Sequence, residues 1–341
     1  MSRQLLQRTL VRRAFFLFAT LVVLGGILPA QDSRRRGQRA KPAAFEGKVA
    51  FAEAPSKLLG RDVRHLVYTP KGYDAPENAR RRYPVLYFLH GLFESAERWD
   101  SRGGSEMIDA AIRRGDLPPV VCIAPDGGSS FYVDSFDGKA PYARFFIEEL
   151  LPFVDATYRT DARRETRMIA GASMGGAGAL RFALKHPELF AGVAAHSAAI
   201  LPKDLEDASA GTKRTLGFVA KRFGSVFGDP IDQGAYRSAN PLTVAEEFKP
   251  DPRLKIWFDC GEKDDYEFHI GARLLHETLA KRGVAHVSKI LPGDHGWEYI
   301  RAATPASMKF LGDALKAAPA ADPKTKPASR PAEDAGSKAS K

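Results

Sequence analysis

Short apolar runs recur through residues 49–315, and between them apolar residues repeat every three to four positions. A continuous apolar run is typical of a strand buried on both faces of a sheet. The runs predict strands at Val63–Thr69, Val85–His90, Val120–Ala124, Met168–Gly171, Gly192–Ala195, Lys255–Asp259 and Val287–Leu291. The helical repeats predict helices at Ser105–Arg114, Tyr142–Tyr158, Gly175–His186, Tyr266–Arg282 and Trp297–Lys316.

This alternation of strands and helices predicts an α/β fold with a mostly parallel sheet and helices on both faces. In such a sheet the chemistry lies at the carboxyl ends of the strands. Residues 198–254 are less regular and hold several aromatic side chains among glycines and charges. They are either a helical excursion packed on the sheet or a cap over a substrate pocket.

The N-terminus has the pattern of an export signal. Four arginines precede an apolar run over residues 14–28, which is short for a membrane span, and Pro29-Ala30 offers a cleavage point. We interpret residues 1–30 as a signal peptide and favour cleavage over an uncleaved anchor, because Gln31 begins a very polar stretch. The globular part is therefore expected outside the cytoplasm, secreted or periplasmic.

The charge of the chain is concentrated at its ends. The net charge is +10, yet residues 1–48 hold ten basic and two acidic residues, and residues 316–341 hold six and three. Residues 31–48 are interpreted as a basic disordered linker and 316–341 as a disordered Ala/Pro/Lys tail. The remaining catalytic domain, 49–315, is close to neutral and has no basic stripe, which excludes a nucleic-acid partner. Weak contact of the ends with an anionic surface stays open.

A G-x-S-x-G motif gives the clearest chemical signal. Gly171-Ala172-Ser173-Met174-Gly175 follows an apolar strand and opens a helix. The small flanking residues suit a strained turn that lifts the serine hydroxyl above the sheet. Ser173 is thus the candidate nucleophile.

A serine nucleophile needs a histidine base and a carboxylate that orients it. His295 follows the last strand in a glycine-flanked loop, and His196 is the alternative base. Asp264 and Asp265 both follow the preceding strand, and each could instead be only a helix cap. The order Ser, Asp, His is that of an α/β-hydrolase.

An oxyanion hole needs two backbone N–H groups. The residue after the serine, Met174, supplies one, and the loop His90-Gly91-Leu92 after the Val85 strand supplies the other. Gly91 permits close approach of the backbone to substrate, so Leu92 N–H is the candidate. His90 is expected to form structural hydrogen bonds rather than to act as a base.

With these elements in order, the chain resembles the putative-esterase family of α/β-hydrolases, which includes feruloyl and acetyl-xylan esterases, S-formylglutathione hydrolase and mycolyltransferases. The resemblance covers roughly residues 49–312. The matching segments are His90-Gly91-Leu92, 125–132, 171–176, 261–264 and 293–297.

The resemblance implies a triad of Ser173, Asp264 and His295, and it favours Asp264 over Asp265. It further implies substrate contacts from His90, Gly91, Tyr132 and Trp297. The family places the strands of Cys122 and Cys260 on opposite sides of the nucleophile strand, so we expect two buried free thiols. His196-Ser197 departs from the family's usual Ser-Gly or Ser-Ala.

The leading hypothesis is a secreted serine esterase that acts on carboxylic esters, with acyl groups on carbohydrates as the substrate class the family suggests. One alternative is an acyltransferase to a sugar or lipid hydroxyl on the same machinery. Another is a non-catalytic hydrolase-fold binding protein. The sequence holds no H-E-x-x-H, phosphate-loop or dinucleotide motif, so no metal and no cofactor is expected.

Overall fold

The computed structural model describes residues 45–318. The predicted signal peptide, most of the predicted linker and most of the predicted tail lie outside these residues. The described part extends slightly beyond the predicted domain at both ends, because a strand begins at Lys48 and the last helix ends at Lys316.

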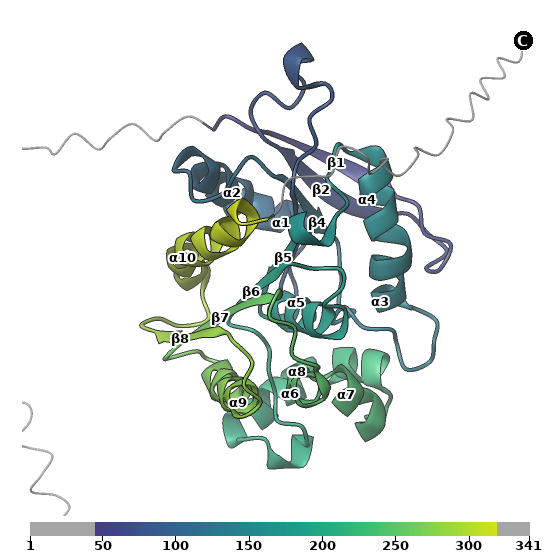
Figure 1. Ribbon diagram of the computed structural model, residues 1–341. Coiled ribbons are helices and arrows are strands. Elements are labelled where there is room, and N and C mark those ends of the chain that lie inside the picture. Colours follow the sequence, from purple (N-terminus) through teal and green to yellow (C-terminus); the bar gives the residue numbers. More distant parts are fainter. Residues whose placement is uncertain (1–44, 319–341) are drawn as a thin grey trace, which may run out of the picture. The chain divides into compact units, whose positions relative to one another are not determined.

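Eight strands form one sheet in the order β1-β2-β4-β3-β5-β6-β7-β8 (Figure 1). β3 to β8 run parallel, and β1 and β2 are antiparallel additions at one edge. The strands are β1 Lys48–Ala54, β2 Val63–Thr69, β3 Val85–Leu89, β4 Val121–Pro125, β5 Arg167–Ala172, β6 Gly192–His196, β7 Lys255–Gly261 and β8 Val287–Leu291. The predicted fold class is confirmed.

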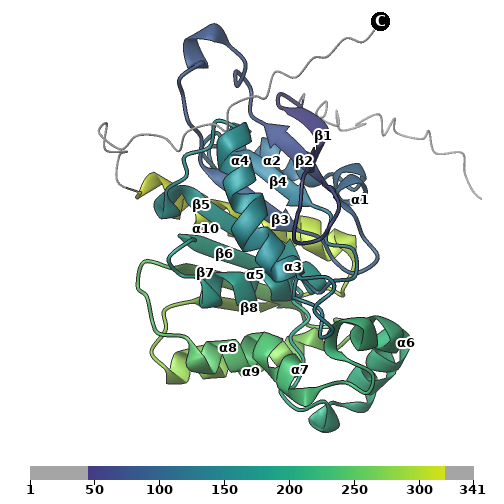
Figure 2. The same ribbon diagram turned by 90° about the vertical axis from the view of Figure 1, so that its right-hand side faces the viewer.

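Helices cover both faces of this sheet. α1, α2 and α10 pack on one face, and α4, α5, α8 and α9 lie on the other (Figures 1 and 2). The helices are α1 Ala96–Ser101, α2 Gly104–Arg113, α3 Tyr142–Arg144, α4 Leu151–Thr157, α5 Met174–Lys185, α6 Ala210–Phe227, α7 Gln233–Ala239, α8 Pro241–Glu247, α9 Phe268–Lys281 and α10 Trp297–Lys316. A π-helical turn, Phe145–Leu150, joins α3 to α4, and 3₁₀ turns lie at Pro76–Asn78, Arg164–Thr166 and Leu205–Asp207. None of the described helices is long and apolar enough to cross a membrane.

The central strands are buried along their whole length. All five residues of β3 and all six of β5 are buried, as continuous apolar runs predict for strands covered on both faces. Because Gly171 pairs with Leu89 and His196 with Asp259, the carboxyl ends of β3, β5, β6 and β7 meet at one edge. The loops that leave this edge carry the predicted site.

The irregular segment 198–254 combines the two predicted roles: one part packs on the helical layer of the sheet, and another part covers a cavity. α8 packs against α5 and α9 and so extends the helical layer. α6 and α7 lie together beyond that layer, toward the lower right of Figure 2, and contribute side chains to a cavity at Ser173.

Cys122 and Cys260 are buried free thiols, as expected. Cys122 lies in β4 and Cys260 in β7, and three strands separate them in the sheet.

Asp109 of α2 links Glu46 and Gly47, just before β1, to Tyr68 of β2. Its buried carboxylate accepts hydrogen bonds from the backbone N–H of Glu46 and Gly47, from Tyr68 Oη and from Arg113 Nε. Burial by itself would raise the pKa of Asp109, but these donors hold the pKa below its ordinary value.

We expect Asp109→Ala to lower the free energy of unfolding by about 3 kcal/mol, because buried donors lose their shared acceptor. The pKa of Asp109 is lower in the folded protein than in the unfolded chain. Its contribution to the free energy of unfolding is therefore complete at neutral pH and is lost as the pH falls below about 4. Urea denaturation at pH 7 and pH 3.5 measures both effects. Asp313→Ala, which removes an exposed partner of Lys309, is the control and should leave the free energy of unfolding nearly unchanged at both pH values.

Candidate active site

Ser173 occupies the turn between β5 and α5 in a strained conformation, with φ 55° and ψ −120°. Its N–H donates to the carbonyl of His196, 2.9 Å away, which ties the turn to β6. Gly175 is required two residues later, because a Cβ there would overlap the backbone carbonyl of Leu89. The local sequence therefore permits the tight turn that raises the serine hydroxyl.

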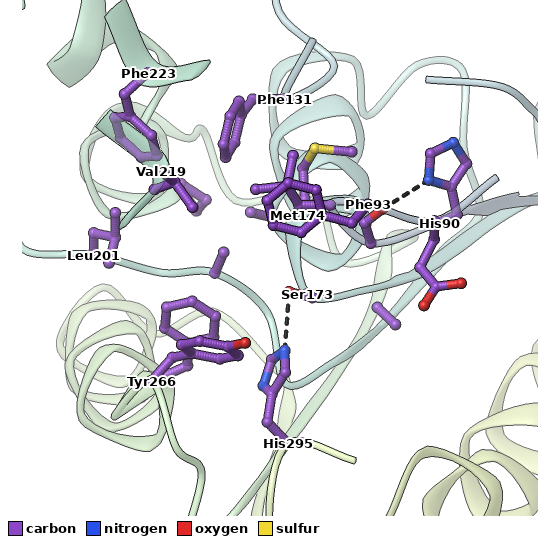
Figure 3. A pocket seen from close by; sticks show the side chains of 18 of the residues that line it. His90, Phe93, Phe131, Ser173, Met174, Leu201, Val219, Phe223, Tyr266 and His295 are labelled. Atoms are coloured by element: carbon purple, nitrogen blue, oxygen red, sulfur yellow. Dashed lines mark hydrogen bonds between the residues drawn. The ribbon is translucent and has the colours of Figure 1, made fainter. Parts of the chain in front are cut away.

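Three predicted side chains meet at this turn. His295 Nε2 lies 3.0 Å from Ser173 Oγ (Figure 3). His295 Nδ1 lies 2.6 Å from Asp264 Oδ2. His295 comes from the loop between β8 and α10, and Asp264 from the loop between β7 and α9. The contacts define the histidine tautomer: Nδ1–H donates to the carboxylate, so Nε2 is free to accept the serine proton.

Asp264, rather than Asp265, faces the histidine. Asp264 is 3% exposed, and its Oδ1 accepts the N–H groups of Tyr266 and Phe268, whereas Asp265 is exposed to solvent. Burial by itself would raise the pKa of Asp264, but the hydrogen bond and charge of His295 and the Tyr266 N–H hold it below its ordinary value. The carboxylate is therefore ionised at neutral pH.

Two aromatic rings fix the orientation of the imidazole. Tyr266 and Phe268 meet the His295 ring edge-on, with ring centroids 4.6 and 5.3 Å away. Asp264 holds the backbone of both residues, so a single carboxylate positions the base directly and through its neighbours.

The loop after β3, His90-Gly91-Leu92 (the oxyanion loop), is the predicted source of one of the two oxyanion N–H groups. His90 Nε2 accepts the N–H of Gly127, so its Nδ1 carries the proton and donates to the Gly91 carbonyl. In a trans peptide the N–H points opposite to the carbonyl, which turns Leu92 N–H away from the His90 ring. Among residues 45–318, neither Leu92 N–H nor Met174 N–H donates to another group.

Close packing at Gly91 brings this loop to the nucleophile, since a Cβ on Gly91 would lie 3.4 Å from Ser173 Cβ. Burial lowers the pKa of His90, which favours its neutral form. With both ring nitrogens engaged, His90 has the structural role expected from the sequence and positions the Gly91–Leu92 peptide.

The predicted substrate contact of Tyr132 is wrong. Tyr132 is fully buried, does not line the cavity at Ser173, and donates from its hydroxyl to the His90 carbonyl, 3.0 Å away. Its ring also packs against Gly178 of α5. The side chain supports the oxyanion loop from below and is too deep for a substrate to reach.

The alternative base, His196, belongs to a second, buried array. Its Nδ1 lies 2.9 Å from Asp259, and its Nε2 lies 3.0 Å from Ser307 Oγ. Trp257 Nε1 and Tyr299 Oη donate to the same carboxylate. His196 and Ser307 are completely inaccessible, so this cluster joins β6, β7 and α10 and excludes His196 as the base.

A cavity of about 270 Å³ opens beside Ser173 and is bounded by the oxyanion loop, α5, α6 and the His295 loop. His90, Gly91 and Trp297, three of the predicted substrate-contacting residues, line it. In Figure 3, Phe131, Val219, Phe223 and Leu201 lie on one side of Ser173.

Sequence reasoning missed most of the cavity lining. Glu94 and Arg102 form an ion pair and line the cavity. Neither belongs to a recognisable sequence motif, so neither was predicted. The apolar residues of α6 repeat at helical spacing, and this repeat was the only sign of the cavity wall in the sequence. Such a repeat more often marks a helix face that packs in the core than one that lines a pocket.

The fold and this constellation together define an α/β-hydrolase with a serine, histidine and aspartate arranged as in serine hydrolases. The comparisons with known proteins are specific: the chain belongs to the family described as Putative esterase, whose model matches residues 56–311. The resemblance found in the motifs is confirmed.

Several named relatives are esterases. An esterase of Mycobacterium tuberculosis is 30% identical over 234 residues, which are 63% of this chain and 49% of the relative. The chain thus spans about half the length of that protein. The acetyl esterase of Caldicellulosiruptor saccharolyticus is 27% identical over 258 residues, 72% of this chain and 90% of the relative.

Solved structures show the same fold. A ferulic acid esterase superposes with a TM-score of 0.66 at 24% identity and covers 80% of this chain and 100% of its own. The ferulic acid esterase of the fungus Anaeromyces mucronatus gives 0.59 at 20% identity, with 84% and 96% covered. At these identities the likeness concerns the fold.

Proposed function

We propose that the protein is a serine esterase that hydrolyses carboxylic esters through an acyl-enzyme. The observation that carries the proposal is the continuous hydrogen-bonded chain from Ser173 Oγ through His295 to Asp264, beside an open cavity. Membership of an esterase family supports it. The intact chain of contacts argues against a non-catalytic binding protein.

In the first half-reaction Ser173 Oγ attacks the ester carbonyl carbon while its proton passes to His295 Nε2. The carbonyl oxygen becomes an oxyanion, which the N–H groups of Leu92 and Met174 stabilise. The imidazolium then gives its proton to the alcohol oxygen as the C–O bond breaks. Asp264 stabilises the imidazolium throughout by accepting from Nδ1.

In the second half-reaction water attacks the acyl-enzyme. His295 Nε2 takes a proton from the water, a second oxyanion forms, and the proton returns to Ser173 Oγ as the acid leaves. These steps involve neither a metal nor an organic cofactor.

We propose a hydroxyl-rich alcohol, such as a sugar, for the leaving group. Trp297 lines the cavity next to His295 and offers an aromatic face, with the Arg102 guanidinium 5.8 Å from its ring centroid. Glu94 pairs with Arg102 and adds hydrogen-bond acceptors. Names of relatives that include acetyl esterase and xylanase/feruloyl esterase support a carbohydrate ester. The export predicted from residues 1–30 is part of this proposal.

A fluorophosphonate probe tests the nucleophile directly. We expect one probe per chain, bonded to Ser173 Oγ with loss of fluoride, because His295 can remove the hydroxyl proton. Intact-mass and peptide mass spectrometry locate the adduct, and loss of p-nitrophenyl acetate hydrolysis should follow labelling one to one. Heat-unfolded protein is the control and should remain unlabelled. Labelling elsewhere, or full esterase activity in the labelled protein, would contradict the proposal.

A further inference from the structure

The cavity at Ser173 continues as an apolar chamber along α5. Ala177 and Arg181 follow Ser173 by one and two helical turns and line the same cavity. At a rise of 1.5 Å per residue, Arg181 lies about 12 Å along the helix axis from Ser173. In Figure 3, Met174, Phe131 and Val219 lie above Ser173, on the side away from His295.

α6 forms the wall opposite α5. Its residues Leu216, Val219, Phe223 and Phe227 recur every three to four positions and all line the cavity, so one face of the helix covers the chamber. Phe131 meets Phe223 edge-on with centroids 4.8 Å apart and continues the wall toward the oxyanion loop.

The polar side chains at the far end of the chamber are already engaged by the protein. Arg181 is 5% exposed and donates to the carbonyls of Phe131, Tyr132 and Ala239. Burial lowers the pKa of its guanidinium to about 10, and it stays charged at neutral pH.

Asn240 and Tyr236 are engaged in the same way. Asn240 donates to the Leu201 and Pro202 carbonyls and accepts from Leu242 N–H. The Tyr236 hydroxyl donates to Pro202 and accepts from Asn240. A ligand that reaches this end therefore meets an amide and a hydroxyl whose donor hydrogens already bind protein oxygens.

We propose that this chamber binds saturated, medium-chain acyl groups and that the α6 wall sets their length. The inference rests on the proposed esterase function. An extended hydrocarbon chain advances about 1.3 Å per carbon, given C–C bonds of about 1.5 Å, so 12 Å accommodates about eight to ten carbons.

Other acyl groups fit this chamber less well. A formyl or acetyl group leaves it empty and forgoes the burial of apolar surface. A hydroxycinnamoyl group fills it but places a phenolic hydroxyl at an end where the polar groups are already paired, which costs binding energy. The chamber therefore favours an aliphatic chain over both.

The chain-length profile of the wild-type protein is the first test. Each buried methylene is expected to raise kcat/KM about fourfold, so p-nitrophenyl octanoate should exceed the acetate at least about 30-fold, with a decline beyond the decanoate. With methanol as the common leaving group, methyl octanoate should exceed methyl ferulate at least about 10-fold. A profile that is flat or falls from acetate to octanoate, or faster turnover of the ferulate, would overturn the inference.

Val219→Trp tests the α6 wall. The indole occupies the chamber, so the octanoate-to-acetate ratio of kcat/KM should fall at least about 30-fold. Ala220→Trp introduces the same side chain on the exposed face of the same helix and should leave the ratio unchanged. An unchanged ratio in Val219→Trp would refute the role of α6. If Val219→Trp does not fold, Val219→Ala should instead shift the optimum to a longer chain, and an unshifted optimum would refute the same role.

The two proposals fail in different ways. Failure of the esterase function appears as an absence of hydrolysis on every ester. Failure of the chamber inference appears as hydrolysis that depends on Ser173 but prefers acetate or ferulate.

Discussion

Replacement of Ser173 by alanine is expected to lower kcat for p-nitrophenyl acetate by at least about 10⁴-fold. The substitution removes the atom that forms the acyl-enzyme and leaves His295 and the oxyanion N–H groups in place. Initial rates at high enzyme concentration measure the loss, and circular dichroism verifies the fold. An alanine protein that keeps more than a tenth of the activity would show that another group performs the chemistry.

Ser307→Ala is the matched control, because Ser307 also contacts a histidine that is paired with an aspartate. This change should leave kcat within about threefold and lower the free energy of unfolding by about 1 kcal/mol through a lost buried hydrogen bond. A comparable loss of activity in both variants would mean that the kinetic effect is structural.

The contrast between the two arrays explains why one of them is suited to catalysis. Both contain serine, histidine and aspartate at hydrogen-bonding distance. The Ser307 hydroxyl lies inside a helix, is completely buried, and contacts the Thr304 carbonyl as well as His196. Ser173 has a strained backbone and an open cavity, and among residues 45–318 the N–H groups of Leu92 and Met174, two residues that line the same cavity, donate to no other group. Access and an oxyanion site, rather than the three residue types, distinguish the candidate active site.

The fold was predictable from sequence where the pattern of residues along the chain is regular. The strands Val63–Thr69 and Val287–Leu291 and the helix Trp297–Lys316 have the predicted bounds, because β-rich runs and helical repeats mark them directly, even though the edge strand β8 is only partly buried. β1 was missed since its residues are mostly exposed and follow a very polar segment. Its position depends on pairing with β2 and on Asp109, a residue 55 positions after the strand.

The candidate site was predictable where a local turn carries the chemistry. Ser173, His295 and the oxyanion loop each stand in a short glycine-containing segment, so small residues marked their positions. The acyl chamber has no such mark, because its walls come from α5, α6 and the loop at Phe131, which only the tertiary fold brings together. Tyr132 was wrongly assigned as a substrate contact, because a motif shows where a residue lies in the sequence but not how deeply the fold buries its side chain.

Asp264→Asn is expected to lower kcat by about 10⁴-fold with little change in fold. The asparagine keeps an oxygen for the Tyr266 and Phe268 N–H groups, so the loop is preserved. Its amide presents N–H to His295 Nδ1, which then must accept, and the proton moves to Nε2. In that tautomer Nε2 cannot take the serine proton, and the imidazolium loses its counter-charge. Steady-state kinetics on p-nitrophenyl acetate measure the effect.

Asp265→Asn makes the same chemical change one residue further along the loop, at an exposed carboxylate, and should leave kcat within about twofold. Both variants remove one negative charge from the same loop. The pair therefore distinguishes the orientation of His295 by Asp264 from a general effect of negative charge on the imidazolium. If long-range charge alone supported the base, the two losses would be similar and would shrink with added salt. A large loss confined to Asp264→Asn, and insensitive to salt, requires the direct 2.6 Å contact with His295.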